Sequence, residues 1–144
     1  MHKPAPLLGL LLRLLNQHWG NHVHEALQKA GFDGLGAANA NVIPFVPEEG
    51  IQVSELAKLA RVRKQSMAQS VEQLEKLGYL ERRPDPNDRR AKLVFLTDRG
   101  AGVRPVALKA GREVERQWAK ATSPEQIEEL RASLQTLLDK LRVE

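Results

Sequence analysis

Two amphipathic helices joined by a tight turn are the clearest structural element in the sequence. The segment VSELAKLA predicts a short helix near Val53–Ala60, and KQSMAQSVEQLEKLG predicts a longer helix that starts at Lys64 and that Gly78 ends. Such a pair forms a helix-turn-helix. The second helix should bury one face, because its apolar residues recur at helical spacing. These residues are Met67, Val71, Leu74 and Leu77.

A basic, polar turn follows the helix pair. The segments YLERRP and AKLVFLT are rich in strand formers and flank the turn within RRPDPNDRRAK, residues 82–92. Strand formers on both sides of a turn rich in Pro, Asp and Asn predict a β-hairpin. A hairpin directly after a helix-turn-helix is the wing of a winged helix-turn-helix.

The N-terminal segment predicts a long helix from about Ala5 to Ala30, because apolar residues recur there at helical spacing and Gly31 can end it. The apolar run Leu7–Leu15 is far shorter than the roughly 20 residues of a membrane span, and Arg13 interrupts it. We interpret the run as a buried helix and expect a cytoplasmic protein without a membrane segment. Residues 32–50 mix Gly, Asn and Pro and predict a short second helix without readable limits.

Two more helices are predicted after the hairpin. Thr97 and Asp98 can cap a long helix that extends to about Ala121 and is expected to bend at Pro105. A capping box with Pro at its first helical position starts the last helix, and it consists of Ser123, Pro124 and Gln126. The predicted fold class is therefore mainly α with a small β-hairpin wing. We expect a single domain of residues 1–144. Its winged helix-turn-helix spans about 51–97, and the flanking helices lie within about 1–31 and 98–144.

The positive charge of the chain is concentrated in one stretch. Residues 61–92 contain nine Lys or Arg against five Asp or Glu, whereas the rest of the chain has 13 of each sign, so the whole net charge of +4 lies in this stretch. A local excess of this kind indicates a surface that faces a polyanion. The alternative is a solvated hairpin edge, since Lys and Arg at an edge also prevent strand addition.

The start of the second helix of the pair carries residues suited to DNA. Opposite the buried face, Gln65 and Gln69 can bond adenine, and Ala68 can touch a thymine methyl in the major groove. Lys64 and Ser66 would reach phosphates, and the hairpin arginines can enter the narrow minor groove. The candidate DNA-binding residues are Arg63, Lys64, Gln65, Ser66, Ala68, Gln69, Arg82, Arg83, Asp88, Arg89, Arg90 and Lys92.

Residues 51–100 resemble the MarR family of bacterial transcription regulators. The motifs that carry the resemblance are VSELAKLA, the D-R-R at Asp88–Arg90 and the L-T-x-x-G at Leu96–Gly100. The resemblance implies a homodimeric DNA-binding regulator with recognition helices in successive major grooves and wings in the minor groove. It also implies that Arg90 is the arginine of the wing tip and that Asp88 positions it.

The resemblance further implies that the first and last helices intertwine in the dimer, and that a small phenolic or lipophilic effector releases the repressor from DNA. An apolar stripe in the last helix independently requires a partner. The candidate dimerisation residues are Leu7, Leu11, Ile127, Leu130, Leu134, Leu137, Leu138 and Leu141. In one respect the chain departs from the family: Gln52 and Arg63 stand where Ser or Thr usually caps the two DNA-binding helices.

Two histidines and a tryptophan on the first helix are candidates for an effector pocket. His18 and His22 are four residues apart on one helix face. They can bind a metal, line a ligand pocket together with Trp19, or simply pack at the surface.

The sequence does not indicate catalysis. It has no Cys, no Gly-rich phosphate loop, no G-x-S-x-G motif and no recognisable triad. The lack of Cys also excludes disulfides, thiolate metal sites and oxidant sensing through thiols. We therefore expect a binding protein that needs no cofactor. The competing interpretation to a DNA-binding regulator is a winged helix that uses its wing and leucine stripe to bind another protein.

Overall fold

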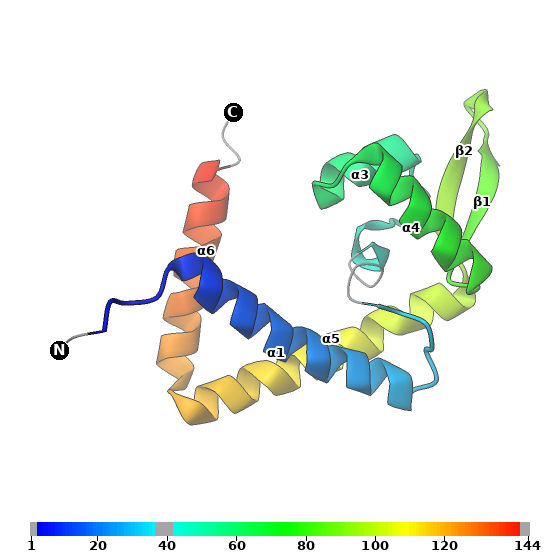
Figure 1. Cartoon of the computed structure of the whole chain (residues 1–144). Coiled ribbons are helices and arrows are strands. Elements are labelled where there is room, and N and C mark those ends of the chain that lie inside the picture. Colours follow the sequence, from blue (N-terminus) through cyan, green and yellow to red (C-terminus); the bar gives the residue numbers. More distant parts are fainter. Residues whose placement is uncertain (1–2, 37–41, 142–144) are drawn as a thin grey trace.

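The computed structural model describes residues 3–36 and 42–141. The chain forms a long helix, a 3-10 helix, two helices joined by a turn, a hairpin and two further helices (Figure 1). The bounds of these elements are α1 Leu8–Lys29, η1 Ile43–Phe45, α3 Val53–Ala60, α4 Lys64–Lys76, β1 Leu80–Asp85, β2 Asp88–Leu96, α5 Asp98–Ala121 and α6 Pro124–Leu141.

Helix α5 connects the two ends of the molecule (Figure 1). At its N-terminal end it contacts β2 and η1, and along its length it packs against α1. At its C-terminal end it contacts α6, which lies away from the helix-turn-helix in Figure 1. We call residues 42–97, which contain η1, α3, α4 and the hairpin, the winged lobe. The winged lobe and α6 therefore occupy opposite ends of α5.

The predicted helix-turn-helix is confirmed. Helix α3 ends at Arg61, which adopts the left-handed conformation with φ 57°, and α4 ends before Gly78 with φ 85°. Neither helix has a side-chain cap at its start, because Gln52 and Arg63 make no capping hydrogen bond there. The departure noted in the sequence therefore leaves the first amides of both helices without a hydrogen bond to the side chain of the N-cap residue.

The hairpin is a two-stranded antiparallel sheet whose pairing runs from Leu80 with Leu96 to Asp85 with Asp88. A third segment joins its base through one isolated bridge. The Ile51 N–H donates to the Val94 carbonyl at 3.0 Å, and the Val94 N–H donates to the Ile51 carbonyl at 2.8 Å. This bridge ties the wing to the chain directly before α3.

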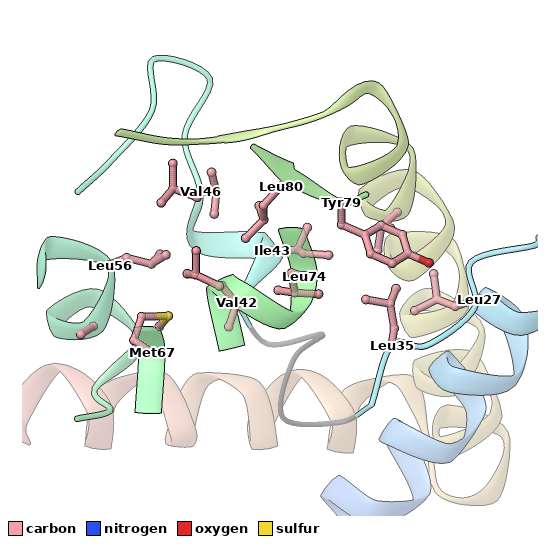
Figure 2. Close-up of a cluster of buried hydrophobic side chains, with 14 residues drawn as sticks. Leu27, Leu35, Val42, Ile43, Val46, Leu56, Met67, Leu74, Tyr79 and Leu80 are labelled. Carbon is pink, nitrogen blue, oxygen red and sulfur yellow. The ribbon is translucent and has the colours of Figure 1, made fainter. Parts of the chain in front are cut away.

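One hydrophobic core lies inside the winged lobe and extends to α1 and α5. Figure 2 shows buried side chains from α3, α4, η1 and β1 pointing toward one another, with Leu27 of α1 and Leu35 at one side. The predicted buried face of α4 is confirmed for Met67, Val71 and Leu74, while Leu77 is half-buried and packs against the core. This core holds helix α4 by its inner face and leaves the outer face of α4 to solvent.

The ends of the flanking helices follow local signals. The Thr97 hydroxyl accepts the Gly100 N–H at 3.1 Å at the start of α5, and the Ser123 hydroxyl accepts the Gln126 N–H at 3.1 Å at the start of α6. Both predicted caps are thereby confirmed. Helix α5 continues through Pro105, and a bend there stays a prediction.

Two sequence expectations differ from the structure near the N-terminus. Helix α1 starts at Leu8 rather than Ala5, because the residue before Pro6 is biased away from helical conformation. In the described part of residues 32–50 the predicted second helix is reduced to the three residues of η1, where Pro44 limits helix length. Residues 37–41 lie outside the described residues.

The expectation that Leu7–Leu15 forms a buried helix is wrong for the single chain. Every residue of this run is exposed, and Leu7 keeps 83% of its surface. Helix α6 is exposed in the same way, with Leu141 at 61% and none of its residues buried. Spacing identifies an apolar face, but only tertiary structure shows whether the same chain covers it.

Over the described residues, none of the helices is both long and apolar enough to cross a membrane.

Candidate nucleic-acid interface

The outer face of α4 presents the polar residues selected from the sequence. Arg63, Lys64, Gln65, Ser66 and Gln69 are exposed, and Ala68 is half-buried. They lie within the first two turns of the helix. Because the Arg63 side chain does not cap this end, the amide groups and the helix dipole add partial positive charge where an anion would approach. The start of α4 thus combines uncharged hydrogen-bonding groups with a phosphate-attracting end.

The wing tip is held by two aspartates that accept backbone N–H groups. Asp85 Oδ1 accepts from the Asn87 N–H at 2.9 Å, and Asp88 Oδ1 accepts from the Arg90 N–H at 3.0 Å. Asp85 Oδ2 also lies 3.4 Å from Gln52 Nε2, just before α3. The two carboxylates therefore order the turn between the strands, which agrees with a positioning role of Asp88 toward Arg90.

The wing arginines divide into two groups. At the base, Arg82 Nε pairs with Glu75 Oε1 of α4 at 2.7 Å, and Arg83 pairs with Glu81 while its guanidinium lies 4.6 Å from the Phe95 ring centroid. At the tip, the exposed cations form no ion pair with any residue that the structure describes. The tip cations are Arg89, Arg90 and Lys92.

This division was not visible in the sequence. Spacing alone gave no sign that Glu75, on a different element, would meet Arg82. The tip cations can bind an external anion directly. The base arginines would first have to break their ion pairs with Glu75 and Glu81. Figure 1 shows the hairpin projecting from the winged lobe beside α4, so the tip and the outer face of α4 belong to one lobe.

The candidate pocket residues contact α5. Trp118 Nε1 donates to His18 Nδ1 at 3.1 Å, and the ring centroids of Trp19 and Trp118 lie 5.8 Å apart. His22 Nε2 lies 3.3 Å from Glu113 Oε2. The two histidines thus have separate partners, and among the described residues no group of three His, Cys, Asp or Glu side chains is placed to hold a metal.

Sequence reasoning missed the α5 partners of this cluster. Gly111 permits the contact, because a Cβ built on it would lie 2.7 Å from Trp19 Cζ2. The sequence signals for this contact were Gly111, Glu113 and Trp118, which lie on the predicted helix from Asp98 to Ala121. The interpretation of His18, Trp19 and His22 as part of a ligand pocket stays a prediction.

The candidate dimerisation residues lie at the surface of the single chain. All of them are exposed except Ile127, which is half-buried, and they belong to α6 and to the N-terminal end of α1. Monomeric proteins rarely leave apolar faces of this extent in water.

Comparison with known proteins shows which proteins this chain resembles. A model described as MarR family matches residues 34–91. No curated protein sequence matches the chain.

Three solved structures share the fold over nearly their whole length. A MarR transcriptional regulator from Methanosarcina mazei Go1 has a TM-score of 0.78 at 21% identity, with 95% of this chain and 98% of that chain covered. A Cys-to-Ser mutant of MarR from E. coli, complexed with operator DNA, has a TM-score of 0.72 at 27% identity, with coverage of 94% and 93%. A probable transcriptional regulator from Pseudomonas aeruginosa has a TM-score of 0.72 at 28% identity, with coverage of 90% and 96%. Residues 34–91 therefore match the MarR family model, and the chain as a whole shares the fold of MarR-family winged-helix transcription regulators.

Proposed function

We propose that the protein is a repressor that binds a pseudo-palindromic operator as a homodimer and leaves it when a small molecule binds. It acts in the cytoplasm as a binding protein, without catalysis or cofactor. The observation that carries the proposal is the pairing of two surfaces in the winged lobe. One is the exposed polar start of α4, and the other is the wing tip with its exposed cations.

In this proposal each surface has a separate task. Gln65 and Gln69 read base edges in the major groove, while Lys64 contacts phosphate. Arg90 enters the adjacent minor groove, where the negative potential attracts arginine. The E. coli relative, at 27% identity, is complexed with operator DNA, which supports DNA as the partner of this chain.

The dimer is proposed from the apolar faces of α1 and α6. Leu134 and Leu138 are exposed in the single chain, as are Leu7 and Leu11. A second copy of the chain would cover them in a two-fold symmetric interface. Two-fold symmetry would place the recognition helices about 34–36 Å apart, one turn of DNA.

The release step is proposed from the contacts between α1 and α5. His18, Trp19 and Trp118 combine aromatic faces with hydrogen-bonding nitrogens, which suits a small phenolic or lipophilic effector. An effector inserted here would separate two helices that support the winged lobe. It would thereby favour a form of the dimer whose recognition helices no longer match the operator.

A titration of duplex DNA over a salt series tests the function. A duplex selected by the protein from a random library should bind at least about a thousandfold more tightly than an unrelated duplex at physiological salt. Both affinities should fall steeply as salt increases, because phosphate contacts release counterions. Equal binding of both duplexes would exclude a sequence-specific regulator and favour the protein-interaction module.

A further inference from the structure

The C-terminal end of α4 is joined to α5 by three successive carbonyl oxygens. The Leu77 carbonyl accepts from Arg99 Nη1 at 2.6 Å. The next two carbonyls accept from one residue, since the Thr97 hydroxyl donates to Gly78 O at 2.5 Å and the Thr97 N–H donates to Tyr79 O at 3.1 Å. We call residues 77–79 and 97–100 the α4–α5 junction. These three carbonyls directly follow α4, and they accept hydrogen bonds from Thr97, the N-cap of α5, and from Arg99 in its first turn.

Arg99 connects this junction to α1 as well. Its guanidinium lies 4.4 Å from the centroid of the Tyr79 ring, and its Nη2 lies 3.5 Å from the carbonyl oxygen of Gly31, just after α1. The buried Tyr79 reaches the same segment, because its hydroxyl donates to Asp33 O at 2.6 Å. One arginine thus touches the ends of α4 and α1 while it belongs to α5.

The chemistry of these contacts favours arginine. A planar guanidinium can stack on a ring and donate in two directions at once, which an ammonium group cannot. A cation is also stabilised at a helix C-terminus by the helix dipole. Burial raises the pKa of Tyr79 above its ordinary value, an effect that the nearby Arg99 cation partly opposes, so the hydroxyl keeps the proton that it donates to Asp33.

We propose that Arg99 is a positioning residue for DNA recognition, which holds the recognition helix at a fixed angle to α1 and α5. The proposal rests on the proposed function, because the angle matters only if two recognition helices must meet one operator. Arg99 acts at the C-terminal end of α4, whereas the residues proposed to read bases lie at its N-terminal end.

Geometry makes this angle important. Helix α4 has 13 residues and is therefore about 20 Å long. A tilt of about 10° at the α4–α5 junction would move the base-reading end by about 3 Å, close to the 3.4 Å step between base pairs. Loss of Arg99 should therefore loosen the match between the half-site spacing and the protein, without removing any contact to DNA.

The test compares three variants with the wild type: Arg99→Ala, Arg99→Lys and Lys109→Ala. Lys109→Ala is the matched control, because Lys109 is an exposed cation on α5 for which no ion pair is found among the described residues. Each protein is titrated with the duplex that the wild type selects from a random library, with versions whose half-sites are moved by one base pair, and with an unrelated duplex.

Arg99→Ala should bind the selected duplex about tenfold more weakly, with its affinity for unrelated DNA changed less than about twofold. The difference in affinity between the selected duplex and the duplexes whose half-sites are moved by one base pair should also be smaller for Arg99→Ala than for the wild type. Arg99→Lys should behave like Arg99→Ala, because lysine restores the charge but not the two-directional contact. Lys109→Ala should behave like the wild type.

Two outcomes of the titrations would overturn the proposal. Equal weakening on both duplexes, with a salt slope reduced by about 0.9 per lost phosphate contact, would make Arg99 a direct phosphate contact. Recovery of the spacing preference by Arg99→Lys would show that only charge matters.

Absence of any sequence preference in the wild type would count against the proposed function itself. Hydrogen exchange then tests whether Arg99 holds the end of α4. The amide to follow is that of Tyr79, which donates to Leu74 O at 2.9 Å at this end. Faster exchange of this amide in Arg99→Ala, with unchanged exchange in the middle of α5, supports the part of the proposal in which Arg99 holds the end of α4. Unchanged exchange at Tyr79 overturns it.

Discussion

Gly100 occupies a position in the first turn of α5 where no larger residue fits. A Cβ built on Gly100 would lie 2.1 Å from the Tyr79 carbonyl oxygen and 3.1 Å from its carbonyl carbon. Both atoms are backbone, so no side-chain rotation can relieve the contact. Gly100→Ala therefore requires the start of α5 to move by about 1 Å from the end of α4, as overpacked sites do.

The cost of Gly100→Ala follows from this movement. Overpacking costs about 1–3 kcal/mol. The two hydrogen bonds from Thr97 to Gly78 and Tyr79 cross the same gap, and each contributes about 1 kcal/mol. Alanine recovers about 1 kcal/mol through its higher helix propensity. The expected net loss of folding free energy is therefore about 2–4 kcal/mol.

Urea denaturation followed by circular dichroism measures this loss. All proteins should be compared at one concentration, because the stability of a dimer depends on it. The matched control is Gly20→Ala in α1, where a Cβ would meet nothing within 4 Å in the single chain, so alanine should stabilise the helix by about 0.5–1 kcal/mol. If Gly100→Ala were as stable as the wild type, the close approach of α5 to Tyr79 would not be a constraint.

Three further predictions concern DNA binding and assembly. Arg90→Ala should weaken operator binding by about 1–3 kcal/mol with an unchanged melting curve, and binding within twofold of the wild type would remove the wing from the mechanism. Lys64→Ala should weaken binding to all duplexes alike, whereas Gln69→Ala should relax base preference at one position of each half-site. A uniform loss with Gln69→Ala would refute its base-reading role. Substitution of both Leu134 and Leu138 by Asp should yield monomers in sedimentation experiments and abolish operator binding. Tight operator binding by a folded monomer would contradict the dimer.

Local features of the winged lobe could be predicted from the sequence because neighbouring residues determine them. The bounds of α3, the start of α4 and its end before Gly78 depend on amphipathic spacing and on a residue with positive φ. The caps of α5 and α6 depend on side chains within three residues of the helix starts. The exposed face of α4, with the candidate DNA-binding residues, followed from the same spacing.

Contacts between distant residues were decided only by the tertiary structure. The pairing of Arg82 with Glu75 and the contacts of Arg99 with Leu77 and Gly31 join different elements, and spacing along one helix carries no information about them. The exposure of the apolar run at the start of α1 has the same origin. Helical periodicity determines that these leucines form a face, but burial depends on which surface lies opposite, and within this chain α5 packs against α1 without burying that run.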